Sequence, residues 1–248
     1  MLGHFLTPRK IARHLFVLAI IAGCVWAGLW QISRLHWQHR FDRTVIARLR
    51  AAAMPFERVV PMGSTADPDA FTYRHVTATG TYDAEHELIW VARTRNELSG
   101  NDVLTPLLLP DGRALLVDRG WVPFEDQTPP VAAAIPPAGT VTLTGVLFPS
   151  EVPAPGKPGA SASAFTKIDL ARIGRGLSRP LTPVYLLLGS QVPAQPGTLP
   201  QLEPLPDLTV SPPHLSYTIQ WFMFATIGVL GYPIVLRREA RRLRASPP

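Results

Sequence analysis

Charged residues and cysteine are scarce in this chain of 248 residues. Asp, Glu, Lys and Arg make up 17% of it, against roughly 25% in an average soluble domain, while hydrophobic residues make up 46%. The single cysteine, Cys24, excludes an internal disulfide framework and any zinc or iron–sulfur site built from several cysteines. The apolar content excludes a chain that is disordered throughout.

The sequence also lacks the short motifs of common enzymes. It contains no glycine-rich phosphate loop, HExxH, CxxC, GxSxG or heme-attaching CxxCH string. Asp83, Glu85 and Glu87 alternate at the entrance of a predicted strand, and we expect this group to be a solvated edge rather than a catalytic pair. A binding or assembly protein is therefore favoured over an enzyme.

Basic residues gather at the two ends of the chain. Residues 1–13 and 237–248 together carry a net charge of +7, whereas the remaining residues sum to −1. Each basic end adjoins an apolar run, which is typical of membrane topology and excludes a nucleic-acid-binding stripe. We therefore expect the lipid bilayer, and no nucleic acid, as a partner.

Two uncharged runs of 18 residues, 15–32 and 219–236, are long enough to approach the roughly 30 Å of a hydrocarbon core. The Lys/Arg distribution places both tails in the cytoplasm and residues 33–213 outside. One alternative for the first run is a cleaved signal peptide, but 18 apolar residues exceed the usual 7–15 and no small-x-small site precedes a polar start. The other alternative is lipidation of Cys24, but apolar sequence continues past it. The expected segments are a basic cytoplasmic tail (1–13), a transmembrane helix (14–33), a juxtamembrane helix (34–54), an extracytoplasmic β-rich domain (55–189), a proline-rich connector (190–213), a second transmembrane helix (214–236) and a second basic cytoplasmic tail (237–248).

Strand signals dominate the region between the two runs. A hairpin is indicated around Asp111 and Gly112, because an Asp-Gly pair between apolar runs is a strong turn signal. The predicted strands are 71–82, 86–95, 103–109, 114–118, 140–148 and 184–188, with a short helix at 168–173. The fold class is therefore a membrane protein in which two transmembrane helices flank a mainly-β (α+β) extracytoplasmic domain, an antiparallel sandwich or open barrel.

Several strings together resemble one protein family. They are GLWQISRL (28–35), GTYD (80–83) with the later Arg93, TPL (105–107), LVDRGWVP (116–123) and HLSYTIQWF (214–222). In this order they resemble the surfeit-locus (Surf-one/Shy type) family of cytochrome c oxidase assembly factors, from about residue 8 to 242. Asp118 stands where Asn is commoner in that family.

The resemblance implies a role in maturing the heme a-containing subunit of a terminal oxidase. It implies transient contact with heme a, and partners that include cytochrome c oxidase subunits and a heme a synthase. The expected location is a bacterial cell membrane, or the mitochondrial inner membrane with the termini in the matrix. Two alternatives stay open: a scaffold that stabilises an oxidase subunit without touching heme, and a two-span sensor or export-associated protein.

Four residues are candidates for heme contact. His214, Tyr217 and Trp221 share one face of the second predicted transmembrane helix, at its start. The positive end of the helix dipole favours a neutral imidazole, which axial ligation of heme iron requires. With the family resemblance we expect His214 to ligate heme iron between the two aromatic side chains; the alternative is an interfacial polar residue. Arg119 could pair with a heme propionate or an oxidase carboxylate, or serve only the turn before Trp121.

Overall fold

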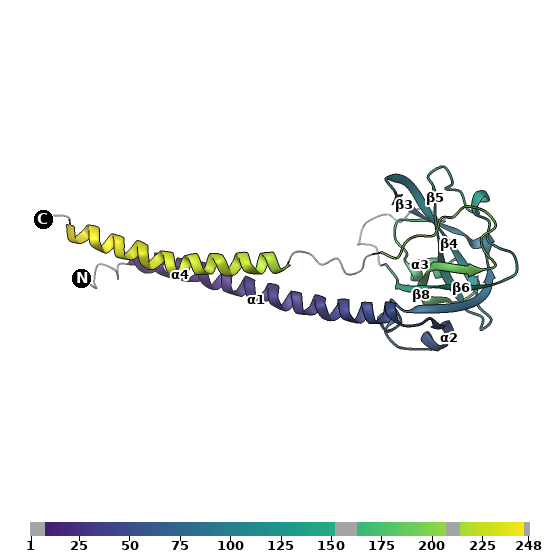
Figure 1. Cartoon of the computed structure of the whole chain (residues 1–248), viewed down its shortest axis with the longest axis horizontal. Coiled ribbons are helices and arrows are strands. Elements are labelled where there is room, and N and C mark those ends of the chain that lie inside the picture. The colour runs from purple at the N-terminus through teal and green to yellow at the C-terminus, as the bar shows by residue number, and fades with distance from the viewer. Residues whose placement is uncertain (1–7, 152–162, 207–213, 246–248) are drawn as a thin grey trace. The chain divides into compact units, whose positions relative to one another are not determined.

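The computed structural model describes residues 8–151, 163–206 and 214–245. The chain divides into two units, one of residues 1–44 with 207–248 and one of residues 45–206. Two long helices make up the first unit and a β-sheet dominates the second (Figure 1). The helices and strands are α1 (Pro8–Arg50), β1 (Met54–Pro55), α2 (Phe56–Val59), β2 (His75–Tyr82), β3 (Leu88–Arg95), β4 (Leu98–Leu108), β5 (Ala114–Pro123), β6 (Thr140–Pro149), β7 (Ala164–Phe165), α3 (Leu170–Gly174), β8 (Leu181–Val192) and α4 (His214–Ala245).

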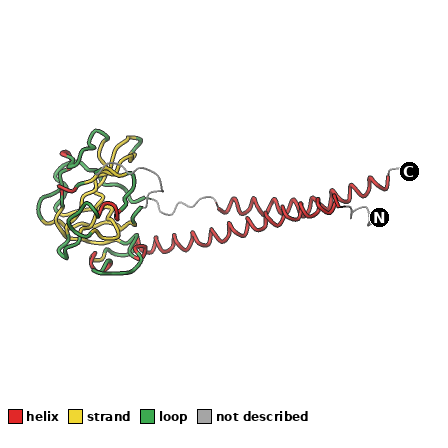
Figure 2. Tube along the Cα trace, turned by 180° about the vertical axis from the view of Figure 1, so that it is seen from behind, coloured by secondary structure: helices red, strands yellow, loops and turns green. Residues whose placement is uncertain are grey.

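The helices α1 and α4 lie side by side in both views (Figures 1 and 2). Glycine allows their close approach: a Cβ on Gly28 would lie 2.9 Å from the ring of Phe222, and one on Gly228 would lie 2.7 Å from the side chain of Ile21. Close packing through small residues is the usual contact between membrane helices. Near their ends, Arg13 donates a hydrogen bond to Glu239 at 2.8 Å, which fixes an antiparallel arrangement.

Both helices present apolar side chains outward. By length and composition, α1 and residues 216–242 of α4 are the two helices in the described part of the chain that could cross a membrane. The large exposed side chains include Leu15 at 61%, Trp26 at 70% and Leu230 at 63%. A core helix of a soluble protein would bury such side chains.

The described strands form one eight-stranded sheet. Its order is β1-β2-β6-β8-β5-β4-β3-β7, and β2 also pairs with β4, so β2, β6, β8, β5 and β4 form a closed circuit of pairings. The predicted hairpin is confirmed, since β4 and β5 pair antiparallel across the turn at Gly112, whose φ of +90° suits glycine. On β6 the predicted alternation is also confirmed, because Val141, Leu143 and Leu147 join the core.

The prediction of a purely antiparallel sheet is wrong. β8 pairs antiparallel with β6 but parallel with β5. A parallel neighbour requires a long crossover, and residues 124–180 provide it here, with β6 and α3 on the way. The domain is thus built on a mixed parallel and antiparallel sheet. In the sequence, it lies between the two candidate apolar helices, α1 and α4.

Several predicted boundaries differ in the structure; β4, for example, begins at Leu98 rather than residue 103. The strand predicted at 71–82 is β2 and begins at His75 rather than residue 71, because Tyr73 has a positive φ of 59° that ends any extended run. The predicted connector is shorter than 190–213, since β8 continues to Val192 and the domain unit extends to Pro206. The rest of that connector, 207–213, lies outside the described residues. We call residues 193–206 the strap.

Candidate functional site

A β-bulge in β5 directs the side chain of Arg119 into the interior of the domain. Asp118 pairs with Leu104 and Gly120 pairs with Val103, so Arg119 is the extra residue between two consecutive pairings. Gly120 has a φ of +120°, and a Cβ there would lie 2.2 Å from the Gln201 carbonyl oxygen. The position therefore requires glycine, both for the backbone torsion and for the space.

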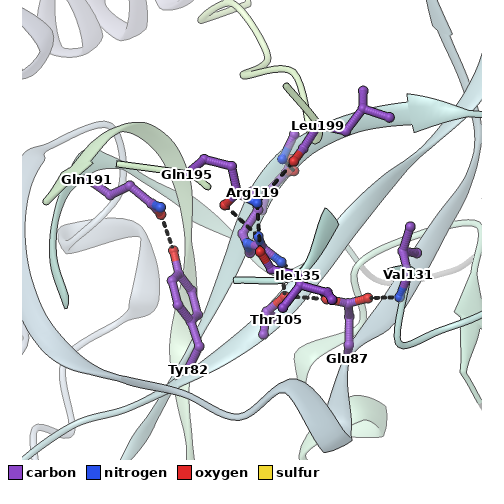
Figure 3. Close-up of polar contacts among 11 residues, drawn as sticks. Tyr82, Glu87, Thr105, Arg119, Val131, Ile135, Gln191, Gln195 and Leu199 are labelled. Carbon is purple, nitrogen blue, oxygen red and sulfur yellow. Dashed lines mark hydrogen bonds and ion pairs between the residues drawn. The ribbon is translucent and has the colours of Figure 1, made fainter. Parts of the chain in front are cut away.

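The Arg119 side chain is 1% exposed and is surrounded by polar groups (Figure 3). Its Nη1 donates to Oε2 of Glu87 at 3.2 Å and lies 3.4 Å from Oγ1 of Thr105. Its Nη2 donates to Oε1 of Gln195 on the strap at 2.8 Å. The guanidinium also lies 5.2 Å from the centre of the Tyr82 ring. We call Arg119 with these four partners the Arg119 network.

Glu87 supplies the negative charge of this network. It is 4% exposed, its Oε1 accepts the Val131 N–H at 2.7 Å, and its Oε2 accepts the Thr105 hydroxyl at 3.2 Å. Burial raises the pKa of the Glu87 carboxyl, although the Val131 N–H and the Arg119 charge act to lower it. Burial likewise lowers the pKa of Arg119. The expectation that Glu87 lies on a solvated edge is wrong, because β3 begins directly after it and carries it inward.

A second buried cluster joins β3, β4 and β5. Asp102 is 0% exposed, and its Oδ2 accepts a hydrogen bond from Nε of Arg93 at 2.6 Å. The Arg93 guanidinium lies 3.9 Å from the centre of the Trp90 ring. Burial raises the pKa of Asp102 to about 6. Burial and the charge of Asp102 raise the pKa of Asp118 well above its usual range.

The strap is tied to the same edge of the sheet. Trp121 and Gln201 exchange two backbone hydrogen bonds of 2.8 Å each. Arg95 donates from Nη1 to the Leu202 carbonyl oxygen at 2.8 Å. Beneath the strap lies a cavity of about 240 Å³, lined in part by Arg119, Gln191 and Gln195. Gly120 and Trp121 were predicted to form a turn. In the structure they also hold the strap against the sheet, through the close approach of Gly120 to Gln201 and the backbone hydrogen bonds of Trp121.

The four predicted heme-contact residues lie in different units of the structure. Arg119 belongs to the domain, whereas His214, Tyr217 and Trp221 belong to the first turns of α4. Tyr217 is 49% exposed, and the Trp221 ring meets the Phe224 ring edge-on at 6.1 Å. The side chain of His214 lies outside the described residues, so heme ligation by His214 stays a prediction.

Arg119 is a predicted heme contact whose side chain already has partners in the domain. Among the described residues, no group of three or more His, Cys, Asp or Glu that could hold a metal ion by themselves occurs. Nη1 and Nη2 of Arg119 already contact protein acceptors, so a propionate would compete with Glu87 and Gln195. The sequence did not identify Glu87 and Gln195 as site residues. Their common partner, Arg119, lies 32 residues from Glu87 and 76 residues from Gln195. No local pattern signals contacts at such separations.

Comparison with known proteins places the chain in a family. The model of the SURF1 family matches residues 18–226. An "Uncharacterized SURF1-like protein" of Mycobacterium tuberculosis is 30% identical over 100% of this chain and 92% of its own length. "Surfeit locus protein 1" of Xenopus tropicalis is 25% identical over 79% of this chain and 66% of its own length. "Cytochrome oxidase assembly protein SHY1" of Saccharomyces cerevisiae is 28% identical over 46% of this chain and 28% of its own length. The predicted resemblance is confirmed: the chain belongs to the SURF1 family.

Proposed function

We propose that the chain is a membrane-anchored, non-enzymatic assembly factor for cytochrome c oxidase. The observation that carries this proposal is the family match over residues 18–226, together with a yeast relative named as a cytochrome oxidase assembly protein. The oxidase subunits are its partners in this proposal. Deletion of the gene should lower membrane heme a and oxidase activity while other cytochromes remain. Fully assembled, active oxidase in a clean deletion strain would refute the proposal.

The proposed anchor consists of α1 and α4 as two transmembrane helices. A lipid bilayer would cover their exposed apolar side chains, which supports this anchor. Their antiparallel contact brings Lys10 and Arg13 near Glu239, which supports both tails lying on one side of the membrane. The basic tails favour the cytoplasmic or matrix side. Alkaline phosphatase fused after Asp126 should be active and after Pro248 inactive; the reverse pattern would overturn this orientation.

In this proposal the factor aids the insertion of heme a. His214 would ligate the iron through its imidazole, with Tyr217 and Trp221 beside the porphyrin. The bound heme would be the group that is delivered to the oxidase, and it would take part in no catalysis on this chain. His214→Ala should lose bound heme while the protein stays in the membrane. His214→Met should retain part of it, because a thioether also serves as an axial ligand. The heme-to-protein ratio of purified variants measures this, with His75→Ala in the domain as the control.

One observation favours a second candidate, a scaffold that stabilises an oxidase subunit without contacting heme. The guanidinium of Arg119 pairs with Glu87 inside the domain, so one of the predicted heme contacts already serves the protein's own structure. A scaffold predicts that His214→Ala supports normal oxidase assembly. An assembly defect of His214→Ala at unchanged protein abundance would exclude this candidate. Co-purification of a heme a synthase with the wild-type chain would also favour heme delivery.

A further inference from the structure

Two buried hydrogen-bond donors are still available at the cavity beneath the strap. Arg119 and Gln191 both line this cavity. Nε of Arg119 and Nε2 of Gln191 are buried, and neither atom makes a hydrogen bond within the described part of the chain. Oε1 of Gln191 is already occupied, since it accepts from the Tyr82 hydroxyl at 2.9 Å (Figure 3). A buried donor is unfavourable unless an acceptor meets it, so the cavity suits a ligand that supplies an acceptor oxygen.

The charge balance of the cavity favours a neutral acceptor. Of the described residues that line it, Arg119 alone is charged. Glu87 offsets that charge, because its Oε2 lies 3.2 Å from Nη1 of Arg119 and each side chain is 1% exposed. A bound carboxylate would therefore leave an excess negative charge in a buried site, which is costly. A carbonyl oxygen accepts the same hydrogen bonds without adding a charge.

Aliphatic side chains form much of the wall. They belong to Leu188, Ala194, Pro200 and Leu202. The cavity volume of about 240 Å³ compares with roughly 30 Å³ for a water molecule in the liquid, so it has room for roughly eight non-hydrogen atoms. A carbonyl group joined to a branched aliphatic chain has this size. On the same strand and strap, Val192 is 72% and Leu202 is 44% exposed, which extends the apolar surface that a partner would cover.

We propose that this cavity binds one aliphatic residue of an oxidase subunit, whose backbone carbonyl oxygen accepts hydrogen bonds from Arg119 and Gln191. The inference rests on the proposed function, because it takes the oxidase subunit as the partner. The aliphatic side chain of that residue packs against Leu188 and Leu202. Since the strap supplies part of the wall, binding also depends on the two backbone hydrogen bonds that hold Gln201 to Trp121.

Binding of small probes to the full-length protein in detergent tests the cavity itself. The probes are isovaleramide, a neutral amide on a branched aliphatic chain, and isovalerate, the carboxylate with the same carbon skeleton. Saturation-transfer NMR gives their dissociation constants. We expect the wild type to bind isovaleramide more tightly than isovalerate.

Two variants change the cavity in different ways. Gln191→Glu removes the Nε2 donor but keeps an oxygen that accepts from the Tyr82 hydroxyl, and it should weaken isovaleramide binding about tenfold. Ala194→Phe fills the cavity from an exposed position and should abolish binding. The matched controls Gln127→Glu and Ala171→Phe make the same changes at exposed positions of the domain, and they should bind as the wild type does.

A second measurement tests the partner in cells. Ala194→Phe and Ala171→Phe are expressed at equal abundance in the deletion strain. We expect the control to restore oxidase activity and Ala194→Phe to leave it low. A photo-reactive benzoylphenylalanine at position 192 should crosslink to an oxidase subunit, identified by peptide mass spectrometry, and Ala194→Phe should remove that crosslink.

Several results would overturn the inference. Equal isovaleramide binding by the wild type, Gln191→Glu and Ala194→Phe would show that no amide enters the cavity. Tighter binding of isovalerate than of isovaleramide would assign the cavity to an anion. Full oxidase assembly with Ala194→Phe, in a strain whose deletion parent lacks oxidase, would refute the inference alone. Full oxidase assembly in the deletion strain itself would refute the proposed function, and the identity of the partner with it.

Discussion

Replacement of Arg119 by leucine should destabilise the domain strongly. The substitution leaves the Glu87 carboxylate, 4% exposed, without its cation, and it leaves Oε1 of Gln195 without its donor. Removing one partner of a buried ion pair costs about 3–5 kcal/mol. We therefore expect Arg119→Leu to lower the free energy of unfolding by about 3 kcal/mol or more at neutral pH.

The pH dependence of that loss follows from Glu87. Its pKa is raised by burial, and removal of the Arg119 charge raises it further. A carboxyl whose pKa is higher in the folded state favours folding while it is protonated, and this contribution disappears as the pH rises through the folded-state pKa. The destabilisation by Arg119→Leu should therefore be smaller at pH 5 than at pH 8.

Hydrogen exchange of the full-length protein in detergent measures the effect. Peptides from β5 and β8 should exchange about 100-fold faster in Arg119→Leu at pH 8, because 3 kcal/mol corresponds to about two powers of ten. Glu87→Gln combined with Arg119→Leu should restore part of the protection, since the amide oxygen still accepts the Val131 N–H without a buried charge. Unchanged exchange in Arg119→Leu would refute the structural reasoning, and loss of heme with unchanged exchange would instead identify Arg119 as a propionate ligand.

Further variants test other parts of the structure. Gly120→Ala should release the strap, because its Cβ would clash with Gln201, and the exchange of strap amides would then rise; unchanged strap exchange would contradict the role of the bulge. Gly28→Val should lower the thermal stability of the detergent-solubilised chain through overpacking, whereas Gly23→Val, with nothing within 4 Å, should not. Burial raises the pKa of Asp102 from 3.8 to about 6. The wild type should therefore lose stability as the pH rises through this window, and urea titrations of Asp102→Asn should show a weaker pH dependence.

The parts of the fold that depend on neighbouring residues could be predicted from the sequence. The turn at Gly112 and the alternation of Val141, Leu143 and Leu147 follow from local torsions and from the two-residue period of a strand. The parallel pairing of β5 with β8 could not be predicted, because it depends on how residues 124–180 cross the sheet. Sequence patterns describe the strand but not its neighbour.

The buried charges escaped prediction for a different reason. Glu87 lies in a run of alternating acidic residues, a pattern that is usually solvated, and nothing near it in sequence indicates a cation. Its partner Arg119 occupies a β-bulge, which interrupts the alternation that would assign a face to it. A buried ion pair therefore requires the three-dimensional structure before either residue can be assigned a role.

The family-like string at 116–123 acquires a structural meaning through this bulge. Arg119 closes an ion pair with Glu87, Gly120 supplies the torsion and the space, and Trp121 pairs with Gln201 of the strap. The strap in turn precedes α4, which begins at His214. A substitution in this string should therefore alter the strap before it alters any ligand chemistry, and a heme defect of an Arg119 variant counts as evidence for direct contact only when the strap amides remain protected.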